Sequence, residues 1–206
     1  MTKIDLHVHT KERSSCGRSS EEEQIRAAIG AGLDAIVFTD HDRLISRSHL
    51  QELNDTYTPF KIFGGIEVSV WDQRLLSYEH LLVLGIHDVA LEHLHWTYPE
   101  LHQFVKENQG FLAVAHLFRF ASETNLDLER FPPDAIEAHS NNIRQHLAER
   151  LESFAEEQGF PVLSNSDAHH INMIGGYYNL LAQTPADERE LIEILRAEEF
   201  KCVYPG

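Results

Sequence analysis

Imidazole and carboxylate side chains follow the short apolar segments of this sequence. The first segment, "KIDLHVHT" (3–10), carries His7 and His9 two residues apart. Alternation along a strand directs both of these side chains to the same side. Two neutral imidazoles gain little from each other, but a metal ion binds both. This spacing therefore predicts a metal site at the end of the first strand.

Later apolar segments end in the same kinds of side chain. The residues concerned are Asp40, His41, Asp42, Glu67, His116, His139, Asp167, His169 and His170. Taken singly, each has an ordinary explanation: Asp40 and Asp42 suit helix N-caps, and His139 suits hydrogen bonding in a pocket. Because they recur at one end of successive strands, together they predict a shared metal-binding rim.

The elements that must position these residues alternate between strands and amphipathic helices. Strands are expected at 3–9, 34–40, 60–70, 79–86, 111–116, 134–140 and 160–167. Helices are expected after the capping box of Ser20 and Glu23 and at 99–108, 143–158 and 186–199, and 200–205 is expected to return to the sheet edge. This alternation predicts a parallel α/β sheet closed as a barrel. The 206 residues are fewer than the roughly 250 of an eight-unit barrel, so we expect a reduced barrel, a single domain over residues 1–206.

The composition limits the partners that we expect. The formal net charge of −16, from 33 acidic and 17 basic residues, disfavours binding to duplex nucleic acid or to an anionic membrane. No apolar run reaches the length of about 18 residues that a membrane helix needs. Cys16 and Cys202 are the only cysteines, and no signal-peptide pattern opens the chain. We therefore expect no disulfide framework and a cytoplasmic location.

Six motifs together resemble the PHP (polymerase and histidinol phosphatase) family. They are "DLHVHT", "GLDAIVFTDHD", "GIEVS", "HLLVLG", "AVAH" and "SNSDAHH…IGG", and they occur in the family's order over nearly the whole chain. The resemblance implies a distorted (β/α)7 TIM-like barrel with two or three divalent metal ions at the carboxyl ends of its strands. Mixed imidazole and carboxylate ligands suit Zn, Mn or Fe better than Mg.

Carried onto this sequence, the resemblance implies a set of ligands for three metals. The first metal is assigned to His7, His9, Glu67 and Asp167, the second to Glu67, His80 and His116, and the third to His41 and His169. For the second metal, the motif "HLLVLG" favours His80, whereas the position at the strand's carboxyl end favours His87. We follow the motif and keep His87 as the alternative.

Two departures from the family pattern affect the expected site. In the loop "TKERSSCGRSS", Ser15 or Cys16 stands where the family often has an Asp or His for the third metal, and a thiolate there could bind zinc. In "AHLFRF", Leu117 replaces a frequent proline, and Arg119 lies three residues after His116, where it could clamp a phosphate bidentately or serve as a surface or structural arginine. Three weaker pocket candidates are Arg18, Arg43 and Asn141.

We predict hydrolysis of a phosphate monoester on a small phosphorylated substrate such as a nucleotide, histidinol phosphate or a sugar phosphate. A metal-activated hydroxide attacks phosphorus, Arg119 neutralises developing charge, and His169, His139 or a water protonates the leaving group. The same metal site fits a phosphodiesterase or an exonuclease on short oligonucleotides, or hydrolysis of a C–N bond. A non-catalytic metal-binding regulatory module is the alternative from outside the enzymes.

Overall fold

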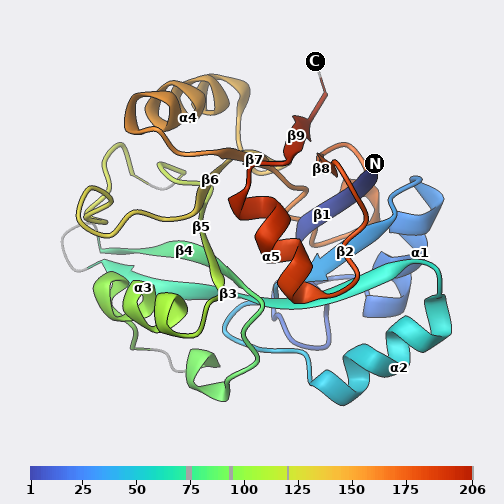
Figure 1. Cartoon of the computed structure of the whole chain (residues 1–206). Coiled ribbons are helices and arrows are strands. Elements are labelled where there is room, and N and C mark those ends of the chain that lie inside the picture. Colours follow the sequence, from blue (N-terminus) through green and yellow to red (C-terminus); the bar gives the residue numbers. More distant parts are fainter. Residues whose placement is uncertain (73–75, 93–94, 120, 206) are drawn as a thin grey trace.

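A computed structural model describes residues 1–72, 76–92, 95–119 and 121–205 (Figure 1). The strands are β1 (Thr2–Val8), β2 (Ala35–Phe38), β3 (Lys61–Asp72), β4 (Ser77–Leu84), β5 (Phe111–Ala115), β6 (Ala135–His139), β7 (Val162–Ser164), β8 (Tyr178–Leu181) and β9 (Phe200–Val203). The helices are α1 (Glu21–Gly30), α2 (Arg47–Tyr57), α3 (Tyr98–Glu107), α4 (Gln145–Gln158) and α5 (Glu188–Arg196), with short 3-10 turns η1 (Val89–Glu92) and η2 (Ile171–Met173).

All the strands belong to one sheet, in the order β7-β6-β5-β4-β3-β2-β1-β8-β9. The pairs β1–β2, β2–β3, β5–β6 and β6–β7 are parallel, as predicted. The prediction of a wholly parallel sheet is wrong for β4, which is antiparallel to both neighbours, and for β8 and β9. The reason is the connection: β3 ends at Asp72 and β4 begins at Ser77, which leaves no room for the crossover that a parallel pair needs.

The two ends of the sheet approach each other through side chains, so the barrel is nearly closed. The Asn179 side chain of β8 accepts a hydrogen bond from Ser164 N of β7 (3.1 Å) and donates one to Ser164 O (2.8 Å). The Ser164 hydroxyl also donates to Val203 O of β9 (2.7 Å). These contacts take the place of a regular ladder, and the expected distorted TIM-like barrel is confirmed.

Helix α5 covers the amino end of the barrel (Figure 1). Its buried Leu191, Ile192 and Leu195 pack with Ile4 and Phe63 of the strands. Each such buried aliphatic side chain contributes about 1.5–3 kcal/mol. Because α5 occupies this end, the carboxyl ends of β1, β2 and β3 open on the opposite side of the molecule.

Helices outside the barrel shield the rest of the sheet. Helix α1 begins with the predicted capping box of Ser20 and Glu23 and packs Ile25 and Ala28 against Val8. The predicted helices at 99–108, 143–158 and 186–199 are confirmed as α3, α4 and α5, while α2 and β8 were not predicted. Within the described ranges, the structure has no helix with the length and apolar character of a membrane span.

Candidate metal centre

His7 and His9 of β1 form the centre of a buried cluster of imidazoles and carboxylates. Their Nε2 atoms are 2.9 Å apart, which confirms that both rings point to the same side. Both nitrogens also face Glu67 Oε2 (3.2 and 3.1 Å) and Asp167 Oδ1 (3.4 and 3.2 Å). All four side chains are almost completely shielded from solvent. Two imidazoles and two carboxylates thus converge on one point.

Glu67 connects this point to further imidazoles. The prediction placed it at the end of a strand, but β3 continues to Asp72, so Glu67 lies mid-strand. Its Oε1 lies 3.0 Å from His80 Nδ1 and 3.1 Å from His116 Nε2, whereas its Oε2 faces the other group. One carboxylate therefore stands between two sets of nitrogen ligands, as a bridging ligand must.

A third group lies toward solvent. Ligand atoms of His9, Cys16, His41 and His169 all lie within 4.8 Å of one another. His41 Nδ1 is also 3.1 Å from Glu67 Oε2. The side chains of His41 and His169 are 26% and 22% exposed, and Cys16 is exposed. The structure thus brings together every predicted metal ligand, and of the two loop candidates, Ser15 and Cys16, it places Cys16 in the outer group.

The buried cluster fits a bound cation better than it fits hydrogen bonding alone. Within the part of the chain that the structure describes, no group makes a hydrogen bond of normal geometry to the buried Glu67 Oε2. Three imidazole nitrogens nevertheless lie 3.1–3.2 Å from this oxygen. A buried acceptor without a donor is costly, and a cation shared with those nitrogens removes that cost. The mixed nitrogen and oxygen donors suit Zn, Mn or Fe.

The inner imidazoles attract protons. Burial alone lowers the pKa of His9, but the carboxylates of Asp167 and Glu67 outweigh it and raise that pKa to about 9. For His7, burial is likewise outweighed by Asp167, Glu137 and Glu67, and its pKa lies well above 6.5. The imidazoliums in turn hold the pKa of Asp167 below its ordinary value despite burial. In the metal-free protein, protons on these imidazoles therefore balance the negative charge of the neighbouring carboxylates.

The outer imidazoles behave in the opposite way. Burial, with the positive charge of neighbouring histidines, lowers the pKa of His41 to about 3 even though Glu67 opposes the shift. Burial and the charge of His9 also lower the pKa of His169. Both rings are therefore neutral at pH 7 and ready to coordinate a cation.

Residues behind the ligands fix their orientation. Glu137 Oε1 lies 2.9 Å from His7 Nδ1 and accepts a hydrogen bond of 2.9 Å from the Asn165 side chain. This contact turns His7 Nε2 toward the cluster. The buried carboxylate of Asp5 accepts hydrogen bonds from His7 N and Ser166 N, and the bond from Ser166 ties β1 to the segment that carries Asp167.

Asp40 organises the loop that carries Cys16. It accepts hydrogen bonds from Thr10 N (2.6 Å), Arg13 Nε (2.8 Å) and Ser14 Oγ (2.8 Å), so it is an anchor for the loop rather than a helix cap or a ligand. The loop folds back so closely on itself that a Cβ on residue 17 would collide with Thr10 O, and Gly17 avoids this collision. The loop is therefore held in place over the cluster.

Two ligands have unusual backbone conformations. His116 and Asp167 have φ values of 32° and 49°. Such conformations cost on the order of 1–3 kcal/mol in residues other than glycine and concentrate at functional sites. The strain agrees with a backbone held so that both side chains reach the cluster.

Arg119 lies beside this cluster. Its Nη1 donates a 3.5 Å hydrogen bond to Asp167 Oδ2, and Asn142 Nδ2 donates to the same oxygen at 2.7 Å. The Arg119 side chain is 30% exposed, so it contacts both the cluster and solvent. The structure thus places Arg119 beside the metal-ligand cluster, and its contact with a phosphate stays a prediction.

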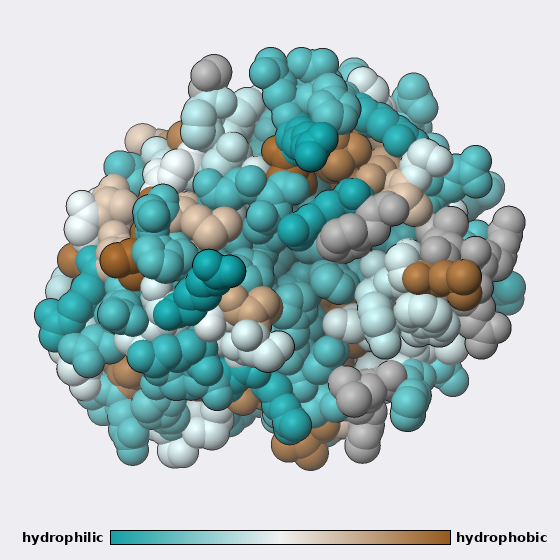
Figure 2. Space-filling model, turned by 180° about the vertical axis from the view of Figure 1, so that it is seen from behind, coloured by the Kyte–Doolittle hydropathy of each residue, from teal (hydrophilic) through white to brown (hydrophobic). Residues whose placement is uncertain are grey.

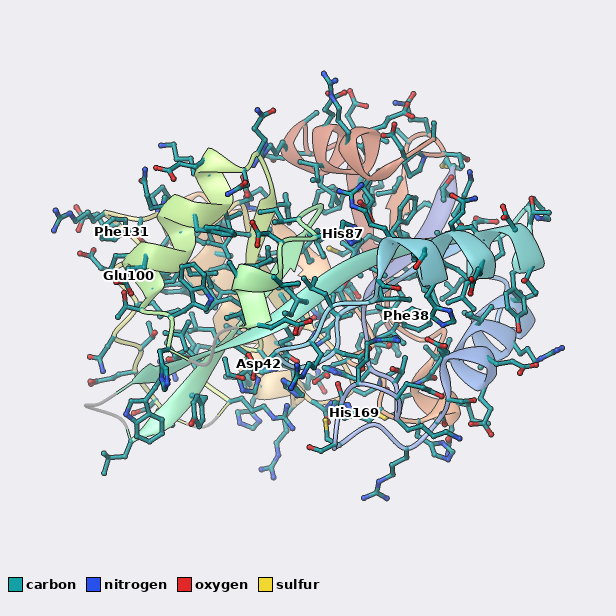
Figure 3. The ribbon with its side chains drawn as sticks, turned by 90° about the horizontal axis from the view of Figure 1, so that it is seen from below. Phe38, Asp42, His87, Glu100, Phe131 and His169 are labelled. Carbon is teal, nitrogen blue, oxygen red and sulfur yellow. The ribbon has the colours of Figure 1, made fainter. Side chains whose placement is uncertain are left out.

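The antiparallel direction of β4 separates the two histidine alternatives. The strand starts at the metal-binding rim, so His80, near its start, reaches Glu67. His87 lies beyond its carboxyl end, where Nε2 contacts Glu188 of α5 at 2.8 Å. Figure 3 shows His87 nearer to α5 and His169 on the opposite side. The strand-end rule selects His87 only if every strand runs the same way.

The structure places His139 away from the metal ligands, against its prediction as a proton donor. The β6–β7 ladder is irregular between Glu137 and His139. Glu137 supports His7, but His139 Nε2 contacts Glu152 Oε1 of α4 at 2.9 Å and its ring stacks on Tyr204. His139 therefore belongs to a pocket beside α4, and we do not retain it as a catalytic residue.

Several weaker candidates have structural partners. Asp42 accepts a hydrogen bond from Ser69 N at 2.9 Å, and Arg43 pairs with Glu92 at 3.1 Å. Asn141 donates to Ser166 O at 2.6 Å. These contacts hold the rim together and do not add ligands to the cluster.

Sequence reasoning missed the supporting residues Asp5, Ser14, Glu137 and Asn165. A usable signal existed, since Asp5 and Glu137 are carboxylates inside apolar strand segments, where an unpaired charge is costly.

Viewed from the side opposite α5, the molecule shows a mostly hydrophilic face with a hollow near its centre (Figure 2).

Comparison with known proteins agrees with this geometry. A family model described as PHP-associated matches residues 146–200. This match agrees with the resemblance of the sequence motifs to the PHP family. The DNA polymerase/3'-5' exonuclease PolX of Bacillus subtilis is 25% identical to this chain, and the match covers 98% of this chain. The phosphoribosyl 1,2-cyclic phosphate 1,2-diphosphodiesterase of Eggerthella lenta is 33% identical over 42% of it. The matches cover only 40% and 32% of those two relatives.

Solved structures share the fold of this chain. A two-domain protein from Bacteroides vulgatus, described as containing a predicted PHP-like metal-dependent phosphoesterase, superposes with a TM-score of 0.72. The identity is 14%, and the match covers 98% of this chain and 64% of that one. An amidohydrolase from Chromobacterium violaceum gives a TM-score of 0.69 at 17% identity, with 98% of both chains covered. At such identities the likeness concerns the fold, and the site itself must indicate the reaction.

Proposed function

We propose that this chain is a phosphoesterase of the PHP type that hydrolyses phosphate monoesters of small substrates, with two or three divalent cations held in the histidine cluster. The observation that carries the proposal is the position of Glu67, whose two oxygens face different sets of imidazoles. An inner pair of cations bridged by one carboxylate is the arrangement that phosphoryl-transfer sites use.

The ligands divide by position. One cation would be held by His7, His9, Glu67 and Asp167. A second would be held by Glu67, His80 and His116, and a third by Cys16, His41 and His169. Bound divalent cations supply Lewis acidity and lower the pKa of coordinated water. The outer set includes a thiol, which favours zinc or another thiophilic metal over Mg.

Residues of the chain itself position the ester. Arg119, partly exposed beside Asp167, donates to a phosphate oxygen and offsets its charge. His169 Nδ1 lies 2.9 Å from Asp167 O. This contact leaves the Nε2 lone pair to coordinate the outer cation, or to take a proton from a water molecule and pass it to the leaving alkoxide.

The net charge of −16 supports a small ester over duplex nucleic acid. Phosphodiester hydrolysis is the second candidate, because both curated relatives are named for an exonuclease or a diesterase. The two candidates share the same metal centre and differ in the second substituent on phosphorus.

The test compares p-nitrophenyl phosphate with bis(p-nitrophenyl) phosphate after the purified chain is reloaded with Zn, Mn or Fe. We expect the monoester to have the larger kcat/KM and chelation to abolish turnover. A preference for the diester would select the second candidate. Metal binding without turnover of either ester would refute both and favour a regulatory module.

A further inference from the structure

The β3–β4 hairpin carries an exposed aromatic pair that the metal centre does not use. Trp71 and Tyr78 are 45% and 50% exposed. Their ring centroids are 4.9 Å apart, with an angle of 64° between the ring planes. Among the described residues, three of the eight exposed large hydrophobic side chains lie on this hairpin, the third being Leu76. Apolar surface gathered in this way marks a binding surface more than scattered residues do.

The strand register places this pair on the same face as the metal ligands. Trp71 lies opposite Tyr78, and Ser69 lies opposite His80. Opposite residues of an antiparallel pair project from the same face, and alternate residues along a strand do so too. Trp71 therefore shares its face with Glu67, and Tyr78 shares its face with His80.

The other face of the hairpin is fixed in the core. Val68, Val70, Leu81 and Val83 alternate with the residues of the metal face and are buried in one apolar cluster. Rotating the hairpin would expose these side chains, so the aromatic pair is held on the metal side. In Figure 3, β3 and β4 extend together past the barrel toward the side where Asp42 and His169 lie.

The distances suit one substrate that contacts both features. Two residues along a strand span about 7 Å, which separates the backbone of Tyr78 from that of His80. In a nucleoside 5′-monophosphate, one ribose unit separates the base from the phosphate. A phosphate at the cluster can therefore place its base at the rings, whereas a sugar phosphate has no planar group to stack.

We propose that Trp71 and Tyr78 bind the base of a nucleoside 5′-monophosphate whose phosphate occupies the metal centre. This inference rests on the proposed phosphoesterase function and names its substrate class. A second copy of the chain is a less suitable occupant, because two molecules with a net charge of −16 repel each other. Stacking accepts any base, so purines with their larger rings should bind best.

The first test compares adenosine 5′-monophosphate with ribose 5-phosphate, which lacks only the base. We expect the intact protein to prefer the nucleotide by about 10-fold or more in kcat/KM. In the double variant Trp71→Ala, Tyr78→Ala, this preference should fall toward unity, through KM, while ribose 5-phosphate turnover stays the same. Tyr204→Ala is the matched control, since Tyr204 is 43% exposed and stacks on His139 instead.

The second test does not depend on turnover. In the Trp96→Phe variant, Trp71 is the remaining tryptophan, and adenosine should quench its fluorescence while ribose does not. Equal turnover of nucleotide and ribose 5-phosphate by the intact protein, or a preference unchanged in the double variant, would overturn the inference and leave the phosphoesterase proposal standing. A double variant that changes only the oligomeric state would assign the rings to self-association instead. If no phosphate ester is hydrolysed but adenosine still quenches Trp71, the phosphoesterase proposal fails and a nucleoside-binding surface remains.

Discussion

The inner and outer halves of the histidine cluster use the same kinds of ligand in different settings. The inner ligands His7, His9 and Asp167 are buried, and residues such as Glu137 and Asn142 orient them. The outer ligands His41 and His169 are partly exposed. The inner half is therefore built to retain cations, and the outer half to exchange a cation or to contact substrate. The two halves differ in the burial of their ligands and in the hydrogen bonds that orient those ligands, more than in the kinds of ligand.

The largest expected effect is at the centre of the inner half. Asp167→Asn removes a charge that faces both His7 and His9, so kcat/KM should fall by at least about 1000-fold. Elemental analysis should also show loss of bound metal. Asp127→Asn, at an exposed position, is the matched control. Full activity in Asp167→Asn would reject the ligand assignment.

A smaller effect, on metal affinity, is expected for a residue that contacts a ligand and not the metal itself. Glu137→Gln keeps the size of the side chain but weakens its hold on His7 Nδ1, so the affinity for inner metal should fall by about 10–100-fold. Competition with a chelator measures this affinity. Glu152→Gln alters the partner of His139 in the same way and should leave metal affinity unchanged. If the two variants behave alike, Glu137 does not orient a ligand.

Proton release distinguishes the two halves. The pKa of His9 is raised from 6.5 to about 9, so its protonation stabilises the metal-free protein below about pH 6.5, and this contribution is lost as the pH rises through 9. The metal-free Tm should therefore fall over that window, and the gain in Tm on adding zinc should grow. Because the pKa of His41 is lowered to about 3, binding of a cation to the outer half should release no proton from the His41 ring.

An indicator dye measures these protons directly. Zinc added at pH 7.5 should release fewer protons from His9→Asn than from the intact protein, and the same number from His41→Asn. Equal release from all three proteins would mean that protons do not occupy the inner half in the absence of metal.

The smallest expected effect concerns Cys16. Cys16→Ser removes one exposed ligand of the outer group, so kcat/KM should fall by less than about 10-fold while the inner metals remain. Cobalt substitution gives a separate readout, since a thiolate ligand produces a near-ultraviolet charge-transfer band. The band should disappear in Cys16→Ser and persist in Cys202→Ser. A cobalt protein without this band would exclude Cys16 as a ligand.

Much of the site could be predicted because several parallel strands carry their ligands at or near their carboxyl ends. His7, His9 and His116 follow this rule, which depends only on local alternation and strand direction. The rule fails at β4, because the direction of a strand is decided by its pairing partners and not by its own residues. It also fails at His139, where an irregularity in the ladder turns the side chain toward α4. Asp40 was ambiguous because its role depends on the folded loop that it anchors.

The number of residues in strands β3 and β4 sets how far the aromatic rings lie from the cations and which face of the hairpin they occupy. Lengthening both strands by two residues would keep the rings on the ligand face and carry them one pleat further from the cations. Removing a single residue from one strand would invert the phase beyond that point and send its ring to the opposite face. Evolution could thus alter the leaving group that this barrel accepts through paired insertions, without changing a cation ligand.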